Sequence, residues 1–359
     1  MSEQTPVAPS REAILEVRDL AVDYGQGRSA LHALAGVDLT LHRGELLGIS
    51  GESGSGKSTF AATITRLLRP PGRIISGSVR YHPRHDPPVD VLTMAEAALR
   101  RWRWEEVSVV FQAAMNSLNP VARVSSQLTD VLEVHRPEMD KRARLDRARE
   151  LAELVGIHES RLSAYPHQLS GGMRQRIMIA MALALDPEIV IMDEPTTALD
   201  VVVQREILTR MSELRARLGF SVIFITHDLS LLLELADEIA VMYAGKIVEL
   251  APAEDLYRSP RHPYTEGLLG SFPSLVGPRR ELVGLVGSPP DLRRVPPGCT
   301  YHERCPIAQD VCARVDPELK THDRRSVACH FRSPGPGPVA VAAAPDSGLP
   351  SGLIEVRDA

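Results

Sequence analysis

The feature that most constrains this chain is a glycine-rich run at residues 51–59, GESGSGKST. It fits the spacing G-x-x-x-x-G-K-[ST], with an apolar stretch before it (46–50) and a helix-compatible stretch after it (59–68). Glycines let the loop curl so that its N–H groups point inward, and the start of the helix adds a positive dipole end. The motif and its flanks therefore predict a phosphate-binding loop between a strand and a helix, rather than a turn that binds nothing.

The residue types of this loop point to separate roles. Lys57 is placed to reach the β- and γ-phosphates of a nucleotide, and the Ser58 hydroxyl can bind Mg²⁺. Tyr24, one strand earlier, is either a core aromatic or a ring that stacks on adenine, and the residue alone does not choose between them. The other predicted nucleotide contacts in the loop are Gly51, Ser53, Gly54, Ser55, Gly56 and Thr59.

Composition limits the choice of partners. The chain has 359 residues, enough for one large domain with an appendage or for two domains. Its net charge of -5 gives no electrostatic reason to expect nucleic acid as a partner. Residues 1–11 lack the apolar core of a signal peptide, and no run of about 18 or more apolar residues occurs. We therefore expect the chain to act in the cytoplasm.

Apolar runs alternate with helical patterns over the first 250 residues. Residues 189–192 and 220–226 are nearly continuous apolar runs, which are typical of strands in a parallel sheet covered on both faces. Residues 34–41 alternate apolar and polar side chains, which indicates a half-exposed strand. From about residue 113 to 185 the pattern becomes helical and charged. We predict an α/β domain over residues 1–250 with a helical insertion.

Polar residues stand where these runs end. Asp193 and Glu194 follow the first apolar run, and His227 follows the second. The run LSGGMRQR at residues 169–176 opens a helix, with Ser170 in the N-cap region. Any one of these groups is a weak signal, because a strand end or a surface histidine is most often only solvated.

In combination and in this order, the motifs resemble the nucleotide-binding subunit of ATP-binding cassette (ABC) transporters over roughly residues 13–250. They are the loop at 51–59, Gln112, LSGGMRQR at 169–176, Asp193-Glu194, Ala-Leu-Asp200 and His227. The resemblance implies a P-loop NTPase fold with a mostly parallel core sheet, an N-terminal antiparallel sheet and a helical subdomain at about 113–185. It also implies an ATPase that uses ATP and Mg²⁺.

The resemblance assigns a role to each matched polar residue. Asp193 would hold Mg²⁺ together with Ser58 and Gln112, directly or through water. Glu194 would polarise the attacking water, and His227 would contact the γ-phosphate. Glu194 and His227 are therefore the predicted catalytic residues.

A second group of residues is predicted to bind nucleotide across a dimer seam. Ser170, Gly171 and Gly172 stand at a helix start, a natural site for an anion. In the family these residues clamp the γ-phosphate held by the opposite subunit, and Asp200 lies on the same seam. The resemblance therefore implies that two cassettes close head-to-tail around two ATP molecules.

Residues 251–332 resemble the C-terminal extension of transporter ATPases of the peptide and nickel uptake group. All four cysteines fall here with wide spacings, C-x5-C-x6-C-x16-C, at Cys299, Cys305, Cys312 and Cys329. Disulfides are disfavoured in a reducing cytosol, and spacings this wide weaken a zinc site, for which His302 and His330 are the further candidate ligands. Members of this group are thought to carry a 4Fe–4S cluster here, and we predict one, with a zinc site or no metal at all as the alternatives.

The end of the chain changes character again. Residues 333–350 form a linker rich in Pro, Gly and Ala, and residues 353–358, LIEVRD, repeat residues 14–19, ILEVRD, almost position by position. A six-residue match can arise by chance. We prefer to interpret residues 351–359 as the start of a second cassette, fused in the full gene product.

The predicted function is that of the ATPase subunit of a peptide importer. Its expected partners are a second cassette, two transmembrane permease subunits and an extracytoplasmic substrate-binding protein, with no nucleic acid. It would then lie at the cytoplasmic face of the cell membrane. The alternative is a soluble tandem cassette protein that acts on ribosomes or nucleic acid, which the acidic net charge and the Cys-containing extension disfavour. The sequence leaves the cargo open between peptide, nickel and another solute.

Overall fold

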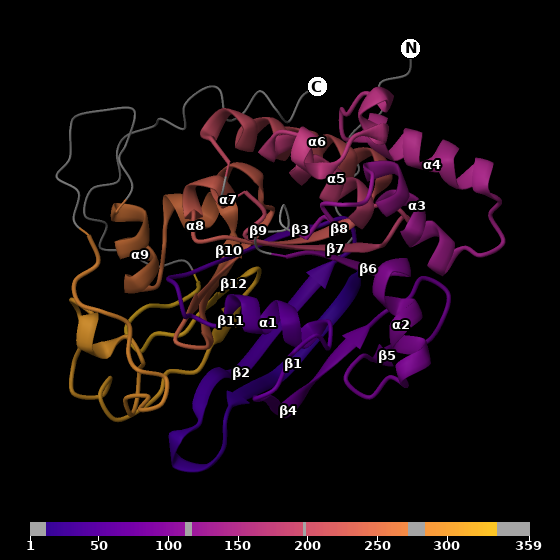
Figure 1. Ribbon diagram of the computed structural model, residues 1–359. Coiled ribbons are helices and arrows are strands. Elements are labelled where there is room, and N and C mark those ends of the chain that lie inside the picture. The colour runs from indigo at the N-terminus through magenta and orange to yellow at the C-terminus, as the bar shows by residue number, and fades with distance from the viewer. Residues whose placement is uncertain (1–11, 112–116, 197–198, 272–283, 336–359) are drawn as a thin grey trace.

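The computed structural model describes residues 12–111, 117–196, 199–271 and 284–335. Two sheets organise this part of the chain (Figure 1). The smaller sheet is antiparallel and has the order β2-β1-β4-β5. Its strands are β1 (Ala13–Tyr24), β2 (Leu31–His42), β4 (Gly72–Tyr81) and β5 (Val89–Asp90).

The larger sheet has the order β11-β12-β10-β9-β3-β8-β7-β6. Strands β9, β3, β8, β7 and β6 run parallel to one another, whereas β10, β12 and β11 continue the sheet from β9 with antiparallel pairs. Its strands are β3 (Leu46–Ser50), β6 (Val107–Val110), β7 (Ile189–Asp193), β8 (Ser221–Ile225), β9 (Glu238–Tyr243), β10 (Lys246–Pro252), β11 (Lys320–His322) and β12 (Arg325–Val327).

The parallel strands are buried on both faces, and each face belongs to a different core. In β8, Ile223 and Ile225 point to the core shared with the smaller sheet and with α1 (Lys57–Ile64), while Val222 and Phe224 point to the opposite core. This alternation follows from the two-residue period of a strand. It explains why these strands are almost continuously apolar in sequence.

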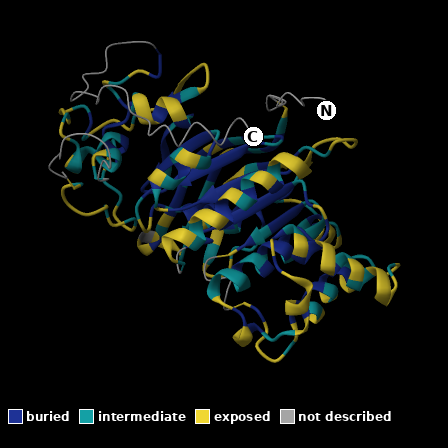
Figure 2. Ribbon diagram, turned by 90° about the horizontal axis from the view of Figure 1, so that it is seen from above, coloured by how far each residue is buried: buried dark blue, intermediate teal, exposed yellow. Residues whose placement is uncertain are grey.

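Helices cover the second face and one end of the larger sheet. Figure 1 shows α6 (Val201–Leu218) and α7 (Leu229–Leu235) on the face opposite α1. Figure 2 shows the buried strands beneath these helices, whose outer faces are exposed. The predicted helical insertion contains α3 (Val124–His135), α4 (Lys141–Leu154) and α5 (Gly171–Ala182). The remaining helices are α2 (Glu96–Glu105), α8 (Ala253–Arg258) and α9 (Pro263–Gly270).

The helix after the glycine-rich loop is shorter than predicted. It begins at Lys57 and ends at Ile64, whereas the apolar pattern extended it to residue 68. Arg66 has a φ of 52°, a left-handed backbone conformation that cannot continue a right-handed helix. Its guanidinium donates to the carbonyl of Met94 at 2.5 Å, so a tertiary contact accompanies this break.

The C-terminal extension is built into the larger sheet. Strand β12 pairs with β10, and β11 completes a hairpin with β12. Glu249 of β10 is 1% exposed and accepts hydrogen bonds from the N–H groups of Arg261 at 2.7 Å and His262 at 2.8 Å, just before α9. Burial lowers the pKa of His262 to about 3, so its ring stays neutral and accepts from the N–H of Tyr264. The extension therefore joins the core through both backbone and buried side chains.

No helix within the described ranges is long and apolar enough to cross a membrane.

Candidate active site

The glycine-rich loop connects the end of β3 to the start of α1, as predicted. Gly51 has a φ of 152°, and a Cβ there would lie 2.1 Å from the carbonyl oxygen of Met242. Gly56 has a φ of 104°, and a Cβ there would lie 2.6 Å from the carbonyl oxygen of Ala33. Both positions therefore require glycine, because real Cβ atoms do not approach backbone oxygens so closely. Of the other predicted contacts, Ser55 is buried, while Ser53 and Gly54 lie on the exposed side of the loop.

The Lys57 side chain folds back into the loop. Its Nζ donates to the carbonyl of Gly51 at 2.6 Å and to the carbonyl of Glu52 at 3.0 Å. Burial lowers the pKa of Lys57, and the carboxylates of Glu194, Asp193 and Glu52 oppose that shift. Three carboxylates thus act on one buried ammonium group.

Asp193 lies at the end of β7 beside the start of α1. It is 5% exposed, and the Ser58 hydroxyl hydrogen-bonds its carboxylate. Burial raises the pKa of Asp193, while the Ser58 hydrogen bond and the Lys57 charge oppose the shift. The buried Oδ1 atom has no hydrogen-bond partner among the described residues. A carboxylate and a hydroxyl side by side, with a carboxylate oxygen left to bind, are oxygen ligands that fit Mg²⁺.

Glu194 and His227 meet across two parallel strands. Strand β7 pairs with β8 so that Asp193 stands opposite Ile225, which brings the next residues of both strands to one edge of the sheet. The Glu194 carboxylate accepts from the His227 N–H at 3.0 Å and lies 2.8 Å from His227 Nδ1. The Glu194 side chain is 11% exposed, and that of His227 is 62% exposed. Glu194 has a φ of 50°, a left-handed backbone conformation that is unusual for a residue with a side chain.

Tyr24 contacts the same helix start from the smaller sheet. Its hydroxyl lies 3.3 Å from Thr59 Oγ1, and its half-buried ring packs against the core between the sheets. A core contact is therefore present, and adenine stacking by the rest of the ring stays a prediction. Gln112 lies outside the described residues.

The residues of the predicted dimer seam gather at two helix starts. Ser170 caps α5 by accepting from the N–H of Met173 at 3.3 Å, and Asp200 caps α6 by accepting from the N–H of Val203 at 3.0 Å. Gly171 and Gly172 form the first turn of α5, and a Cβ at Gly172 would lie 2.5 Å from Val203 Cγ1. The two helix starts are therefore in contact.

Two residues of the extension reach the glycine-rich loop, and the sequence analysis did not identify them. Arg304 forms two hydrogen bonds with the Glu52 carboxylate, and the Tyr264 hydroxyl accepts from the Glu52 N–H. Tyr264 falls in a stretch that resembles the extension of the uptake group, so the sequence marked this region but not the contact of Tyr264 with the loop. No pattern in a single sequence connects Arg304 to a loop 252 positions away.

The predicted iron–sulfur cluster, and the zinc site considered as its alternative, were wrong. Within the described ranges, which contain all four cysteines, no group of three or more His, Cys, Asp or Glu side chains is arranged to hold a metal ion. All four are free cysteines. Burial, with a contribution from the other three thiols, raises the pKa of Cys299 to about 11, and burial also raises the pKa of Cys305. Burial therefore favours the neutral form of the Cys299 and Cys305 thiols.

The histidines considered as further ligands are also engaged elsewhere. His302 Nδ1 lies 2.7 Å from the carbonyl oxygen of Cys299, and His330 Nε2 lies 2.8 Å from that of Val315. The presence of four cysteines and the resemblance were a poor guide here, because neither tells whether the side chains converge with ligand geometry.

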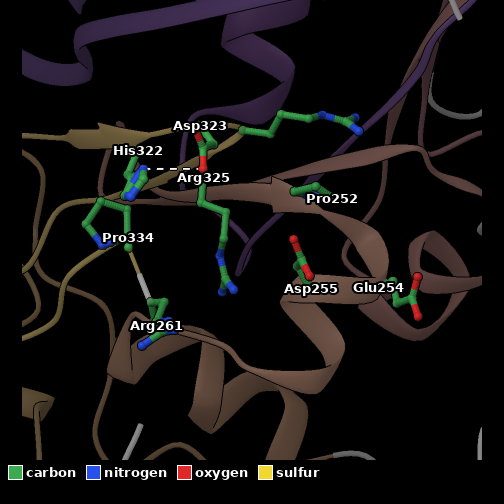
Figure 3. Close-up of a pocket in the computed structure, with 10 residues that line it drawn as sticks. Pro252, Glu254, Asp255, Arg261, His322, Asp323, Arg325 and Pro334 are labelled. Carbon is green, nitrogen blue, oxygen red and sulfur yellow. Dashed lines mark ion pairs between the residues drawn. The ribbon is translucent and has the colours of Figure 1, made fainter. Parts of the chain in front are cut away.

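A cavity of about 690 Å³ is lined by residues of the extension together with Pro334 and Gly335 (Figure 3). Its wall carries both signs of charge, and His322 forms an ion pair with Asp323 at 3.4 Å. It is lined by Pro252, Glu254, Asp255, Arg261, His322, Asp323, Arg324, Arg325, Pro334 and Gly335. None of the predicted nucleotide-binding residues lines it.

Comparison with known proteins agrees with this geometry. Residues 34–197 match the family model described as ABC transporter. The dimeric structure of a post-hydrolysis state of an ATP-binding cassette bound to ADP and Pi aligns with a TM-score of 0.58 and 27% identity, over 67% of this chain and 99% of that one. The chain therefore belongs to the ABC transporter family. The predicted cassette fold and ATPase class are confirmed.

The relatives narrow the group. Residues 248–312 match the model described as oligopeptide/dipeptide transporter, C-terminal region. The dipeptide transport ATP-binding protein DppD of Haemophilus influenzae is 43% identical over 89% of this chain and 95% of its own length. The oligopeptide transport ATP-binding protein OppD of Bacillus subtilis is 42% identical over 89% of this chain and 90% of its own length. OppD of Mycobacterium tuberculosis is 44% identical over 85% of this chain, which spans 50% of that longer protein. The chain belongs with these transport ATP-binding proteins.

Proposed function

We propose that this chain is the ATP-hydrolysing subunit that powers an ABC importer for short peptides. The observation that carries the proposal is the meeting of four polar side chains at the ends of β7 and β8 and at the start of α1. Ser58 contacts Asp193, and Glu194 contacts His227. The peptide cargo rests on the match of the C-terminal region and on the names of the relatives.

Each side chain of this group has a task in ATP hydrolysis. Ser58 and Asp193 would hold Mg²⁺, together with Gln112, and the metal would neutralise charge on the phosphates. Lys57, released from the loop carbonyls, reaches the β- and γ-phosphates. Glu194 takes the proton of the attacking water as a general base, and such help contributes about 10²–10⁴-fold in rate. His227 holds Glu194 in place and contacts the γ-phosphate.

A second cassette completes the site in this proposal. Ser170, Gly171 and Gly172 offer a helix start to the γ-phosphate bound by the partner, and Asp200 lies beside them on the same surface. Closure of two cassettes around ATP and their reopening after hydrolysis would move two permease subunits of the membrane. An extracytoplasmic binding protein would deliver the peptide, and this chain would lie at the cytoplasmic face.

The division of the chain follows the same proposal. Residues 1–250 form the ATPase domain, with the helical subdomain at about 113–185, and residues 251–332 form the extension. Residues 333–350 are a linker, and residues 351–359 begin a second cassette. The repeat of residues 14–19 near position 353 and the greater length of the mycobacterial relatives support the fusion. Sequencing the open reading frame beyond residue 359 tests it, and a stop codon there would contradict it.

The test of the function compares wild type with Glu194→Gln after reconstitution with the permease subunits in proteoliposomes. We expect wild type to hydrolyse ATP and to accumulate a labelled dipeptide or short oligopeptide, and the variant to bind ATP without turnover or uptake. Glu213→Gln is the matched control, because Glu213 is an exposed carboxylate on α6 that pairs with Arg210. Turnover that responds to ribosomes or nucleic acid, with no membrane partner bound, would refute the importer.

A further inference from the structure

Glu52, the second residue of the glycine-rich loop, is held by the C-terminal extension. Arg304 Nη1 donates to Glu52 Oε2 at 2.6 Å, and Arg304 Nη2 donates to Glu52 Oε1 at 3.0 Å. The Glu52 N–H donates to the Tyr264 hydroxyl at 2.9 Å. Both the side chain and the backbone of this loop residue are thus bound by residues more than two hundred positions away. A two-pronged guanidinium–carboxylate pair sets orientation as well as charge.

Arg304 is itself fixed in one orientation. Its Nε donates to the carbonyl of Val286 at 2.9 Å, and its Nη1 also donates to the Tyr243 hydroxyl at 3.2 Å. The guanidinium lies 5.7 Å from the ring centre of Tyr243 and 5.8 Å from that of Tyr301, which adds cation–π attraction. The side chain is 5% exposed. This is a rigid, desolvated arginine rather than a surface pair.

Glu52 lies beside Lys57, so the Arg304–Glu52 pair affects how the loop binds phosphates. Its carbonyl accepts from Lys57 Nζ at 3.0 Å, and its carboxylate is one of the charges that act on Lys57. A bare carboxylate in a loop that receives a polyphosphate would repel it and would compete for the lysine. An arginine placed on that carboxylate cancels most of the repulsion.

We propose that Arg304 is a positioning residue for nucleotide, which acts through Glu52 and makes the extension part of the ATP-binding loop. The proposal rests on the proposed function, in which this loop binds ATP. By neutralising Glu52 and holding its backbone with Tyr264, the extension sets the affinity of the loop for the phosphates. The extension thus does more than complete the sheet.

The experiment measures MgATP and MgADP affinity of the full chain by competition against a fluorescent nucleotide, with thermal unfolding recorded for each variant. Arg304→Gln leaves Glu52 charged, and we expect MgATP affinity to fall about tenfold, with a smaller fall for the less charged MgADP. Glu52→Gln leaves Arg304 cationic, and we expect MgATP binding to tighten. In the double variant the affinity should return to within about twofold of wild type. In ATPase assays, KM should change and kcat should not.

Arg324→Gln is the matched control. Arg324 lies in the same extension, but its guanidinium pairs with Glu238, the first residue of β9, at 2.7 Å. We expect its nucleotide affinity to equal that of wild type.

Three outcomes overturn the inference. The first is a wild-type MgATP affinity in Arg304→Gln. The second is a loss of MgATP affinity that is equal in Arg304→Gln and in the double variant. The third is a Glu52→Gln variant that binds MgATP no more tightly than wild type. If Arg304→Gln fails to fold, the MgATP affinity of Glu52→Gln alone tests the inference. If wild type itself does not bind ATP, the proposed function fails instead, which separates the two conclusions.

Discussion

The two groups of predicted ATP-site residues lie in contrasting surroundings. Lys57, at the start of α1, and Asp193, at the end of β7, are buried, and their polar atoms contact other members of the group. Ser170 and Asp200 stand at helix starts, and the hydrogen bonds that they accept come from their own helices. Next to Asp200, Val201 and Val202 are 80% and 78% exposed.

This difference indicates which part of the site the chain assembles by itself. The sheet brings the first group together within one chain, and in the proposed function this group binds nucleotide within one cassette. The second group is presented outward beside two exposed valines, as expected of a surface that another cassette covers. Changes in the first group should therefore affect nucleotide binding by a single chain, whereas changes in the second should affect ATP turnover only when two cassettes meet.

The largest effect is expected from Asp193→Asn. It removes the buried carboxylate charge beside Ser58, and ATP turnover should fall by about 10²-fold or more, with a higher Mg²⁺ requirement. A Mg²⁺ titration of ATPase activity measures this. Asp186→Asn is the control, since Asp186 is 68% exposed and pairs with Arg147. An unchanged Mg²⁺ dependence of ATPase activity in Asp193→Asn would contradict the assignment of Asp193 as a Mg²⁺ ligand.

A strong effect is expected from Gly172→Ala at the contact between the two helix starts. The new Cβ would lie 2.5 Å from Val203 Cγ1, and such overpacking costs about 1–3 kcal/mol of unfolding free energy. Adding Val203→Ala should restore most of the loss, because it removes the atom that clashes. Denaturant unfolding of the single and double variants measures both changes. If Gly172→Ala and the double variant had equal unfolding free energies, contact between the new Cβ and Val203 would not be the cause of the loss.

A smaller effect is expected from Ser170→Ala. Loss of the cap should cost about 1 kcal/mol of stability, and loss of the γ-phosphate contact should lower turnover about tenfold, with ATP affinity of the single chain unchanged. Asp140→Ala is the matched control, because Asp140 caps α4 in the same way, by accepting from the N–H of Ala143 at 2.8 Å. Stability should fall in both variants and turnover only in the first. If turnover fell to a similar extent in both variants, the role of Ser170 would be that of a helix cap alone.

The smallest effect is expected from Tyr24→Phe, which removes the hydroxyl near Thr59 and keeps the ring. ATP affinity should change less than about twofold, whereas Tyr24→Ala should weaken it severalfold if the ring stacks on adenine. Nucleotide titrations with ATP and GTP measure the change. An unchanged affinity in Tyr24→Ala would leave Tyr24 as a core residue only.

Local sequence predicted much of this protein because several of its features depend on neighbours in the chain. The spacing of Gly51, Gly56 and Lys57 requires a tight loop between strand and helix, and that loop is present. Apolar runs without alternation required burial on both faces, which the parallel strands have. The order of the motifs was enough to indicate the cassette family.

Tertiary structure decided what depends on side chains that converge from distant positions. The pairing of β7 with β8 joins Glu194 to His227, and the path of the extension joins Arg304 to Glu52. The same dependence explains the wrong metal prediction, since the four cysteines of the extension do not form a ligand group in the described structure. Sequence determines which residue types and local conformations are available. Only the packed chain determines which of them meet, because those contacts depend on the relative placement of whole elements.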